Sequence, residues 1–261
     1  MTDRRRYVVT GSSTGMGAAF VERVRAAGGT VTGLDVADPT VPVDEFIRTD
    51  LSDPDSIDAA VGRIAALDVL VNCAGVPDTR LPADKVFAIN YLGLRKLTLD
   101  LHERIADGGD VLHISSQAGN RYRENEALHR DLAATGSFAE GAAWFASGAA
   151  AGVSTYRLTK EAVWWFTFTG ARLGFARGVR SNSVAPGIVS TALEDDFMSQ
   201  MSEVSMNRIR STGGRTAQPD EIAGIMQTVL APQMRWMNGH NLLADGGFLA
   251  DSAVTTAAVV R

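Results

Sequence analysis

Short runs of β-branched and other apolar residues alternate with stretches of helical periodicity along almost the whole chain. Between the runs, apolar residues recur at helical spacing, as at Ile57, Val61 and Ile64 behind the helix-start signal "SDPD". Consecutive strands joined by helices pair in parallel, with helices on both faces of the sheet. We therefore predict a doubly wound α/β fold. Its strands are expected at "YVVT" from residue 7, "TVTGLD" from 30, "FIRTD" from 46, "DVLVN" from 68, "DVLHISS" from 110, "VRSNSVAP" from 179 and "HNLLAD" from 240.

No internal repeat, low-complexity tract or linker divides the chain, so residues 1–261 are expected to form a single domain. The formal net charge of −5, with both signs mixed, argues against a nucleic-acid partner. No apolar run has the length of a signal-peptide core or a membrane span, so no membrane partner is expected. The one cysteine, Cys73, excludes an intrachain disulfide framework and is interpreted as a packing residue. A reducing compartment, the cytoplasm, is the expected location.

Residues 120–153 form an unusually long connection between a strand and a helix of a compact domain. Leu128 and Leu132 are four residues apart, and "SFAE" at 137–140 has the pattern of a capping box. An alanine-rich stretch with Trp144 and Phe145 follows this box. The segment is therefore predicted to be an inserted helical element.

Three glycines, Gly11, Gly15 and Gly17, lie between the first strand pattern and the first helical pattern. The first permits a tight turn, the second lets the backbone approach a pyrophosphate, and the third allows the helix to pack closely. A helix N-terminus at this place would offer free N–H groups to phosphates. These features predict a dinucleotide site, with a purely structural turn as the alternative.

Asp35 follows the second strand, 18 residues after Gly17, where a carboxylate can accept hydrogen bonds from ribose hydroxyls. No Arg or Lys lies between Val31 and Ile47 to neutralise a 2′-phosphate. NAD is therefore predicted in preference to NADP. The alternative is that Asp35 is an exposed turn residue at a strand end.

"STYRLTK" places Tyr156 and Lys160 one helical turn apart on the same face. An ammonium group near a phenol favours the phenolate and lowers the pKa of the phenol, which suits acid/base chemistry. Taken alone, such a pair more often marks one face of an amphipathic helix. Ser115 and Ser116 end a strand pattern, at the sheet edge where open α/β folds bind ligands.

Several motifs occur in the order found in one family. "TGSSTGMG" from residue 10 has the spacing TGxxxGxG, "NCAG" at 72–75 is similar to NNAG, "YRLTK" matches YxxxK, and "PGIVST" follows the sixth strand. Over nearly its whole length the chain resembles the short-chain dehydrogenase/reductase family, whose members have a Rossmann fold.

The resemblance implies a role for each site residue. Ser116 would orient the substrate, Tyr156 would exchange the proton, Lys160 would perturb Tyr156 and contact the nicotinamide ribose, and Asn90 would position a relay water. Ser116 is preferred to Ser115 because neighbouring side chains in a strand point to opposite faces. The cofactor contacts implied are Gly11, Ser13, Thr14, Gly15, Met16, Gly17, Asp35, Asp50, Leu51, Asn72, Ala74, Gly75, Tyr156, Lys160, Pro186, Gly187, Ile188 and Thr191.

The spacing between Ser116 and Tyr156, 40 positions, exceeds that of most relatives because the inserted segment lies between them. Bacterial 3α-hydroxysteroid dehydrogenase/carbonyl reductases and coniferyl-alcohol dehydrogenases are a subgroup with such an insertion. In most members the helix that bears the tyrosine, with the helix before it, forms a dimer face. The insertion is expected to cover or remake that face, which predicts a dimer of different geometry, with a tetramer as the alternative.

A substrate lid is expected at about residues 188–213. There Phe197, Met198, Met201 and Met206 offer apolar surface, unless the helices bury their own methionines. Trp144, Trp164 and Trp165 add aromatic surface that would suit a steroid or a terpenoid alcohol. No metal site is expected, because the histidines are scattered without carboxylate or cysteine partners at ligand spacing: His102, His113, His129 and His240.

These features favour an NAD-dependent oxidoreductase that interconverts a secondary alcohol and a ketone on a bulky hydrophobic substrate, such as a 3α-hydroxysteroid. The alternatives are a dehydrogenase of coniferyl or terpenoid alcohols, an epimerase, dehydratase or lyase on the same fold, and a dinucleotide sensor without turnover. A sensor would be expected to have lost Tyr156 or Lys160. The final stretch "DSAVTTAAVVR" carries no functional signal beyond a tail that packs on the last strand or on a partner subunit.

Overall fold

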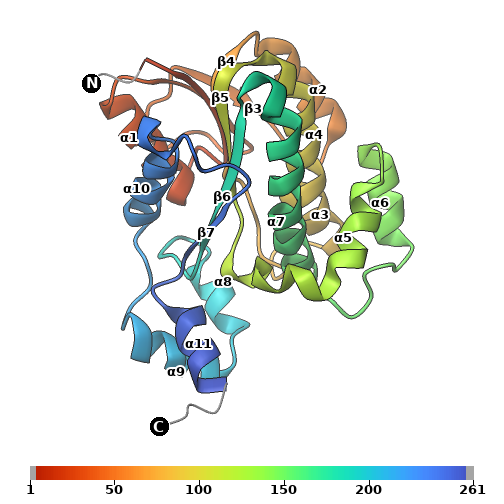
Figure 1. The fold of residues 1–261 in the computed structure, drawn as a ribbon, viewed down its shortest axis with the longest axis vertical. Coiled ribbons are helices and arrows are strands. Elements are labelled where there is room, and N and C mark those ends of the chain that lie inside the picture. Colours follow the sequence, from red (N-terminus) through yellow and green to blue (C-terminus); the bar gives the residue numbers. More distant parts are fainter. Residues whose placement is uncertain (1–3, 257–261) are drawn as a thin grey trace.

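Seven parallel strands form one sheet in the computed structural model, which describes residues 4–256 (Figure 1). All seven predicted strands are confirmed, and they lie in the order β3-β2-β1-β4-β5-β6-β7. The bounds are β1 (Arg6–Thr10), β2 (Thr30–Asp35), β3 (Glu45–Arg48), β4 (Leu67–Asn72), β5 (Ile105–Ile114), β6 (Arg180–Pro186) and β7 (Asn241–Ala244). The chain is therefore a single Rossmann-like α/β domain, as predicted.

Helices cover both faces of this sheet (Figure 1). α1 (Gly15–Ala26) and α10 (Pro219–Val229) lie on one face, while α2 (Pro54–Arg63), α4 (Leu94–Leu101) and α7 (Thr155–Gly174) lie on the other. The remaining helices are α3 (Ala83–Phe87), α5 (Glu126–Ala133), α6 (Phe138–Ala146), α8 (Glu194–Ser199), α9 (Glu203–Thr212) and α11 (Phe248–Thr256). A π-helical turn (Ala88–Gly93) joins α3 to α4. Among residues 4–256, no helix is both long and apolar enough to cross a membrane.

The strand pleat divides the core between the two faces. Tyr7 and Val9 pack with α1 and α10, whereas Val8 between them packs with α2 and α4. This division follows because successive side chains of a strand point to opposite faces, and a sheet covered on both sides needs apolar residues at every position. The second core cluster includes Ile57 and Val61, the residues whose spacing predicted α2.

The inserted segment is helical, as α5 and α6 (Figure 1). Ser137 caps α6 by accepting a hydrogen bond from the Glu140 N–H at 3.1 Å. The Glu140 carboxylate, however, accepts from the Gly136 N–H at 2.6 Å instead of from Ser137, so the predicted capping box is displaced by one residue. Both devices stabilise the start of α6.

A buried carboxylate anchors the insertion to α7. Glu161, the residue after Lys160, is fully buried and accepts hydrogen bonds from Asn125 at 2.7 Å and from Arg157 at 2.6 Å, and pairs with His129 Nε2 at 3.0 Å. Breaking such a buried, hydrogen-bonded ion pair is costly. Glu161 therefore fixes α5 against the helix that carries Tyr156.

A second anchor holds the insertion against α4. The buried Arg95 donates to the carbonyl oxygens of Leu132 and Ser137 at 3.3 and 2.8 Å. Phe138, Trp144 and Phe145 then pack against the cluster formed by α3, the π-helical turn and α7. The insertion thus covers one side of α4 and α7.

The last described helix, α11, includes the first six residues of the stretch "DSAVTTAAVVR" and lies beside α9 (Figure 1). The remaining residues, 257–261, lie outside the described residues, and so does the rest of the expectation about the tail.

The strand order reverses between β1 and β4, which are neighbours in the sheet although two strands separate them in sequence. The loops that follow β1 and β4 consequently leave towards opposite faces. A crevice at the carboxyl ends of the strands, at such a switch point, is where open α/β folds bind ligands.

Candidate active site

The loop after β1 presents an uncapped helix end to the crevice. α1 begins at Gly15, and the side chain of its N-cap residue, Thr14, makes no capping hydrogen bond. The first N–H groups of α1 are therefore available to an anion. Gly11 has φ +65°, and a Cβ there would lie 2.8 Å from the Ala74 backbone, so this turn accepts only glycine. A Cβ on Gly17 would lie 2.0 Å from the Gly11 carbonyl oxygen, which explains the third glycine as a packing requirement.

Asp35 lies at the end of β2, beside this loop. One carboxylate oxygen accepts from the Ser13 N–H at 3.0 Å and the other from the Ala37 N–H at 3.0 Å. The carboxylate lines the crevice and closes it at the far end from Tyr156.

The sequence suggested that no Arg or Lys lies near Asp35, and the structure shows that this expectation is wrong. Arg48 pairs with Asp35 in the register of β2 and β3, one residue beyond the sequence window that lacks Arg and Lys. Its guanidinium donates to the Val36 carbonyl oxygen and forms an ion pair with Asp38, both partners being exposed. Strand pairing between distant segments creates this proximity.

An elongated cavity runs from Asp35 past the glycine loop to the end of β4. Two predicted cofactor residues line neither this cavity nor the one that contains Tyr156. They are Ser13, whose hydroxyl donates to the Ala37 carbonyl oxygen, and Asn72, whose amide faces Thr98 and His113 in the core. Predicted residues that line it are Gly11, Thr14, Gly15, Met16, Gly17, Asp35, Asp50, Leu51, Ala74, Gly75 and Thr191. Lining residues that were not predicted are Leu34, Val36, Thr49, Cys73, Val76, Arg80, Ile89, Ala192 and Leu193.

A second cavity holds the predicted reacting groups and adjoins the first. Ser116, Tyr156 and Lys160 line it together with Pro186, Gly187 and Ile188. The two cavities share Met16, Cys73, Gly75, Thr191 and Leu193 in their walls. The two cavities are therefore adjacent.

The two serines after β5 have different surroundings. The Ser115 hydroxyl donates to the Lys160 carbonyl oxygen at 3.0 Å and so supports the backbone of α7. Ser116 instead lines the same cavity as Tyr156, and its side chain lowers the pKa of the phenol. Only Ser116 is thus placed beside the proton-exchanging group expected from the sequence.

The pKa values of the pair differ from the sequence expectation. Burial raises the pKa of Tyr156 to about 12; the hydrogen bond with Ser116 opposes this rise, and the charge of Asp78 adds to it. Burial lowers the pKa of Lys160 to about 8. The Lys160 ammonium lies 5.6 Å from the centre of the Tyr156 ring and donates to the Ile114 carbonyl oxygen at 3.0 Å. The sequence predicted that Lys160 lowers the pKa of Tyr156, but the pKa is raised instead, because desolvation dominates.

Asn90 lies in the π-helical turn, buried behind the second cavity and outside its lining. Its side-chain oxygen accepts from the Val76 N–H at 2.8 Å, and its amide donates to the Val76 carbonyl oxygen at 2.8 Å. Asn90 therefore fixes the loop after β4. A Cβ on Gly75 would lie 3.3 Å from Lys160 Nζ and 3.5 Å from Asn90 Oδ1, which places these three residues together.

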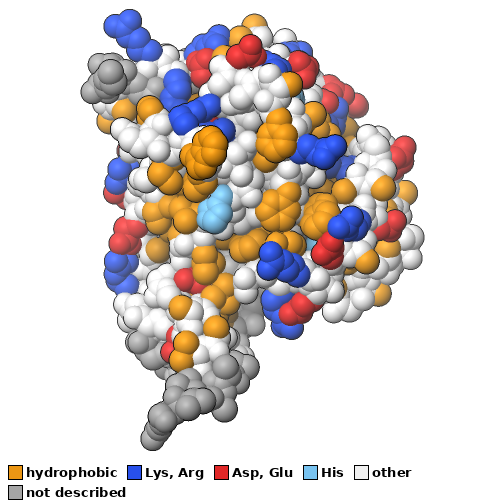
Figure 2. Space-filling view, in the orientation of Figure 1, with side chains coloured by type: hydrophobic (Ala, Val, Ile, Leu, Met, Phe, Trp, Pro, Cys, Tyr) orange, Lys and Arg blue, Asp and Glu red, His pale blue; other side chains and the backbone are white. Residues whose placement is uncertain are grey.

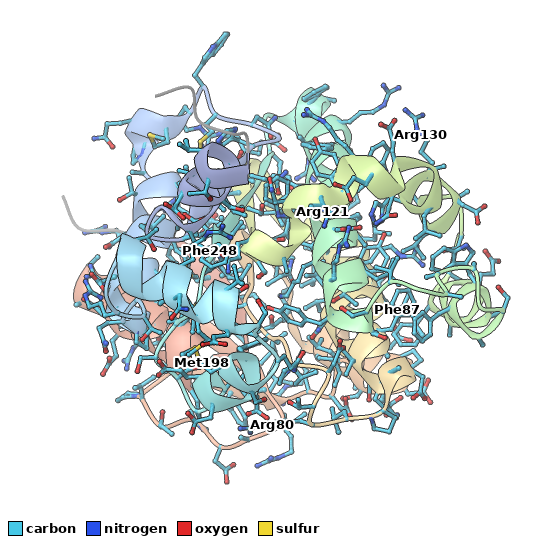
Figure 3. All side chains as sticks on the ribbon, turned by 90° about the horizontal axis from the view of Figure 1, so that it is seen from below. Arg80, Phe87, Arg121, Arg130, Met198 and Phe248 are labelled. Atoms are coloured by element: carbon cyan, nitrogen blue, oxygen red, sulfur yellow. The ribbon has the colours of Figure 1, made fainter. Side chains whose placement is uncertain are left out.

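The expected lid segment contains α8 and α9 (Figure 3, where Met198 of α8 is labelled). Phe197 and Met201 line the second cavity, and the Phe197 ring centre is 5.0 Å from that of Tyr156. Met198 and Met206 do not line it. The three tryptophans expected to add aromatic surface lie elsewhere, since Trp144, Trp164 and Trp165 pack around α7 and the insertion.

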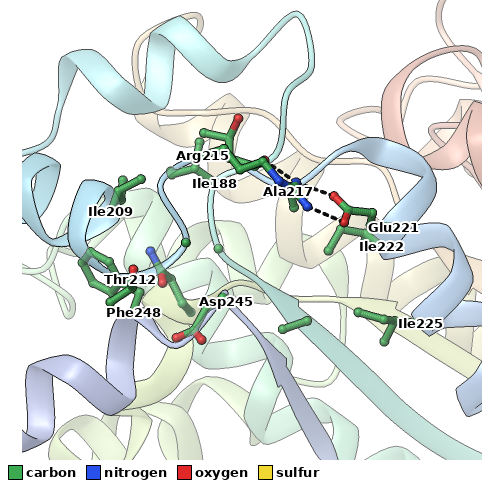
Figure 4. A pocket seen from close by; sticks show the side chains of 16 residues that line it. Ile188, Ile209, Thr212, Arg215, Ala217, Glu221, Ile222, Ile225, Asp245 and Phe248 are labelled. Carbon is green, nitrogen blue, oxygen red and sulfur yellow. Dashed lines mark hydrogen bonds and ion pairs between the residues drawn. The ribbon is translucent and has the colours of Figure 1, made fainter.

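A third cavity, of about 270 Å³, lies behind the lid between α9, α10 and α11 (Figure 4). Its wall contains Ile209, Ile222 and Phe248, together with the ion pair of Arg215 and Glu221. Gln117, Gly187 and Ile188 belong to both this cavity and the one with Tyr156. The side-chain oxygen of Gln117 is buried and has no hydrogen-bond partner among the described residues.

Cys73 and the histidines of the described residues are not arranged as ligands of a metal ion. Burial raises the pKa of the Cys73 thiol to about 12, so the thiolate is disfavoured. Burial lowers the pKa of His113 to about 3. In the described part of the chain, no three His, Cys, Asp or Glu side chains are grouped as they would be around a metal ion.

Comparison with known proteins identifies the family of this chain. A family model described as short chain dehydrogenase matches residues 5–128, and a model described as Enoyl-(Acyl carrier protein) reductase matches residues 126–249. The chain is 36% identical to the coniferyl-alcohol dehydrogenase of Pseudomonas sp. strain HR199 over 93% of this chain and 96% of that one. It belongs to the short-chain dehydrogenase/reductase family. The protein is thus an oxidoreductase of alcohols, and the family resemblance found in the sequence is confirmed.

Two further similarities are to hydroxysteroid dehydrogenases, which belong to the subgroup that the inserted segment suggested. The 3-alpha-hydroxysteroid dehydrogenase/carbonyl reductase of Comamonas testosteroni is 27% identical over 92% of this chain and 95% of that one. The crystal structure of the 3-alpha-hydroxysteroid dehydrogenase from Pseudomonas sp. B-0831 complexed with NADH superposes with a TM-score of 0.76 at 28% identity, covering 98% of this chain and 100% of that one. Both relatives match along almost their full length.

Proposed function

We propose that the protein is an NAD-dependent dehydrogenase. Its substrate would be a largely apolar molecule that contains a ring and an alcohol group. The observation that carries the proposal is the wall shared by two adjacent cavities. One contains Asp35 and the uncapped start of α1, and the other contains Ser116, Tyr156 and Lys160. A dinucleotide that extends from Asp35 to Gly75 would bring its nicotinamide beside Tyr156. The comparison with an NADH-bound relative supports this cofactor.

The bound nicotinamide would supply or accept the hydride, and the chain's own residues would handle the proton. In oxidation, Tyr156 takes the hydroxyl proton of the substrate, and in reduction it returns that proton to the carbonyl oxygen. Ser116 holds the same oxygen through its hydroxyl. Lys160, whose Nζ lies beside Gly75, would contact the nicotinamide ribose and carry the positive charge nearest to the phenol. Asn90 keeps the loop of Gly75 and Val76 in place, and its relay-water role stays a proposal.

Two observations favour an aryl alcohol of the coniferyl type over a 3α-hydroxysteroid. The identity to the coniferyl-alcohol dehydrogenase is 36%, against 27% for the hydroxysteroid relative. The buried oxygen of Gln117, beyond Ser116, would also accept a hydrogen bond from a second hydroxyl, such as a phenol. The third cavity, which Gln117 adjoins, would take the distal part of either substrate. We propose a cytoplasmic location, since a reducing compartment suits a free thiol.

The proposal predicts NADH formation when the purified protein and NAD meet a suitable alcohol. The panel should contain coniferyl alcohol, 3α-hydroxysteroids and monoterpene alcohols, and NADP should be tested in parallel. We expect absorbance of NADH with coniferyl-type alcohols first. Turnover on hydroxysteroids alone would reverse the substrate order, and silence on all of them despite NADH binding would favour the dinucleotide-sensor alternative.

We also propose a dimer that does not use the face formed by α4 and α7. The insertion covers part of that face, whereas β7 is an edge strand that pairs only with β6. Apolar side chains gather over β7 and α7 on the face shown in Figure 2. Large apolar side chains in or near these two elements are exposed, namely Leu173, Phe175, Trp236 and Leu243. Exposed edges and apolar patches of this kind favour association. Light scattering should give the mass of two subunits, and a mass of four would contradict the proposal.

A further inference from the structure

The loop after β4 contacts three parts of the active site through residues 76–80. At its start, the Val76 backbone forms two hydrogen bonds with Asn90, both 2.8 Å long. At its end, Arg80 donates to the Asp196 carboxylate at 2.8 Å and to the Ala192 carbonyl oxygen at 2.6 Å, both in the lid segment. Since both ends are fixed, the middle of the loop is held in place.

Asp78 occupies that middle and faces the start of α7. One of its carboxylate oxygens accepts a hydrogen bond from the Tyr156 N–H at 2.7 Å. This N–H belongs to the first turn of α7, where backbone donors have no partner within the helix. Ser154, the N-cap residue, accepts from the Arg157 N–H instead, at 3.4 Å. Asp78 therefore provides a second cap, from a separate loop, at the residue that exchanges the proton.

The position of this carboxylate has two physical consequences. A negative charge at a helix N-terminus interacts favourably with the helix dipole, which fixes the first turn of α7. The geometry of a proton-transfer group must also be held within a fraction of an ångström for efficient transfer. We propose that Asp78 is a positioning residue that sets the place of Tyr156 through its backbone N–H. The proposal rests on the proposed dehydrogenase function.

The same carboxylate acts on the phenol electrostatically. The charge of Asp78 raises the pKa of Tyr156, in the same direction as burial. Two other titratable groups line the cavity of Tyr156, namely Lys160 on the same helix and Cys73 just after β4. The loop of Asp78 also carries Arg80, which forms an ion pair with Asp196 of α8. Burial raises the pKa of Asp78 itself, while its hydrogen bond with Tyr156 lowers it.

Two substitutions separate positioning from charge. In Asp78→Asn the side-chain oxygen still accepts from the Tyr156 N–H, so kcat should stay within about threefold of the wild type. The charge is lost, so the acid limb of kcat/KM for alcohol oxidation, along which Tyr156 becomes deprotonated, should move to lower pH. In Asp78→Ala the contact is lost as well, and kcat should fall about tenfold or more with a smaller change in the KM for the alcohol. Asp84→Asn, an exposed carboxylate at the start of α3, is the matched control.

The pH profiles of the four proteins, measured beside their melting temperatures, decide the question. Lower melting temperatures with an unmoved acid limb and unchanged kcat would overturn the proposal, because they would leave Asp78 a stability role alone. Equal loss of kcat in both Asp78 variants without a shift of the limb would overturn it too. If Asp78→Ala does not fold, the limb of Asp78→Asn decides alone. Absence of turnover in the wild type would instead refute the dehydrogenase function, so the two failures are distinguishable.

Discussion

Replacing Tyr156 with phenylalanine should remove almost all turnover while NADH binding stays close to that of the wild type. The substitution deletes only the phenolic oxygen, the atom that would exchange the substrate proton. The ring would keep its contact with Phe197, at 5.0 Å between centres, and its position near Lys160. A positioned acid/base group contributes about 10²–10⁴ in rate, so kcat should fall by about 10³. Steady-state kinetics with the best alcohol, and titration of NADH fluorescence, measure the two quantities.

Tyr122 offers the matched control for that substitution. Its side chain is also largely buried, but it packs against Trp164 and Phe168, away from the cavity with Ser116. Tyr122→Phe should therefore retain wild-type kcat. If Tyr156→Phe kept more than about a tenth of the turnover, or weakened NADH as strongly as it slowed the reaction, its role as the proton-exchanging group would be wrong.

Replacing Asp35 with alanine should weaken NAD binding by about 10²-fold and NADP binding much less. Hydrogen bonds to a charged group contribute about 1.5–3 kcal/mol, and the carboxylate would accept them from the adenosine ribose hydroxyls of NAD. With NADP, the same carboxylate would instead repel the 2′-phosphate, so its removal offsets part of the loss. Dissociation constants for NAD and NADP, obtained from fluorescence titrations, give the ratio directly.

Asp35 also stabilises its own loop, and the control variants must separate this structural role from cofactor binding. Asp35→Asn would still accept from the Ser13 or Ala37 N–H, so a loss of both cofactors in Asp35→Ala that Asp35→Asn does not share would indicate a loop defect. Asp38→Asn removes the ion-pair partner of Arg48. That variant should improve NADP binding if Arg48 can turn towards a 2′-phosphate. Equal affinity changes for NAD and NADP in Asp35→Ala would remove the basis for the cofactor preference.

Sequence reasoning was most reliable where local chemistry decides the structure. β4 was identifiable because a strand covered on both faces is usually apolar at nearly every position, as "VLV" at 69–71 is. The helix at Pro54 was identifiable because Asp53 caps it and accepts from the Asp55 N–H at 3.0 Å. The helical character of the insertion was recognisable from Ser137, although the Glu140 contact is displaced.

Residues that act through distant partners were not identifiable in this way. Asp78 and Arg80 follow "NCAG" in a loop without periodicity, and their partners Tyr156 and Asp196 lie about 80 and 116 positions further along the chain. Asn72, by contrast, belongs to a motif, yet its side chain points into the core towards His113. A motif shows which residue type is present, whereas the direction of the side chain depends on the strand pleat and on its neighbours.

The sequence by itself determined the order of strands and helices, the glycine loop before α1 and the presence of a serine, a tyrosine and a lysine in dehydrogenase order. These depend on residue types at short spacing, where sterics and hydrogen bonding act locally. Only the tertiary structure decided which charges surround them: Arg48 beside Asp35, Asp78 against the Tyr156 N–H, and a buried environment that raises the pKa of Tyr156 to about 12 and lowers that of Lys160 to about 8. Desolvation and the distances between charges depend on which distant segments the fold brings together. These distances cannot be predicted from the residues next to each group in the sequence.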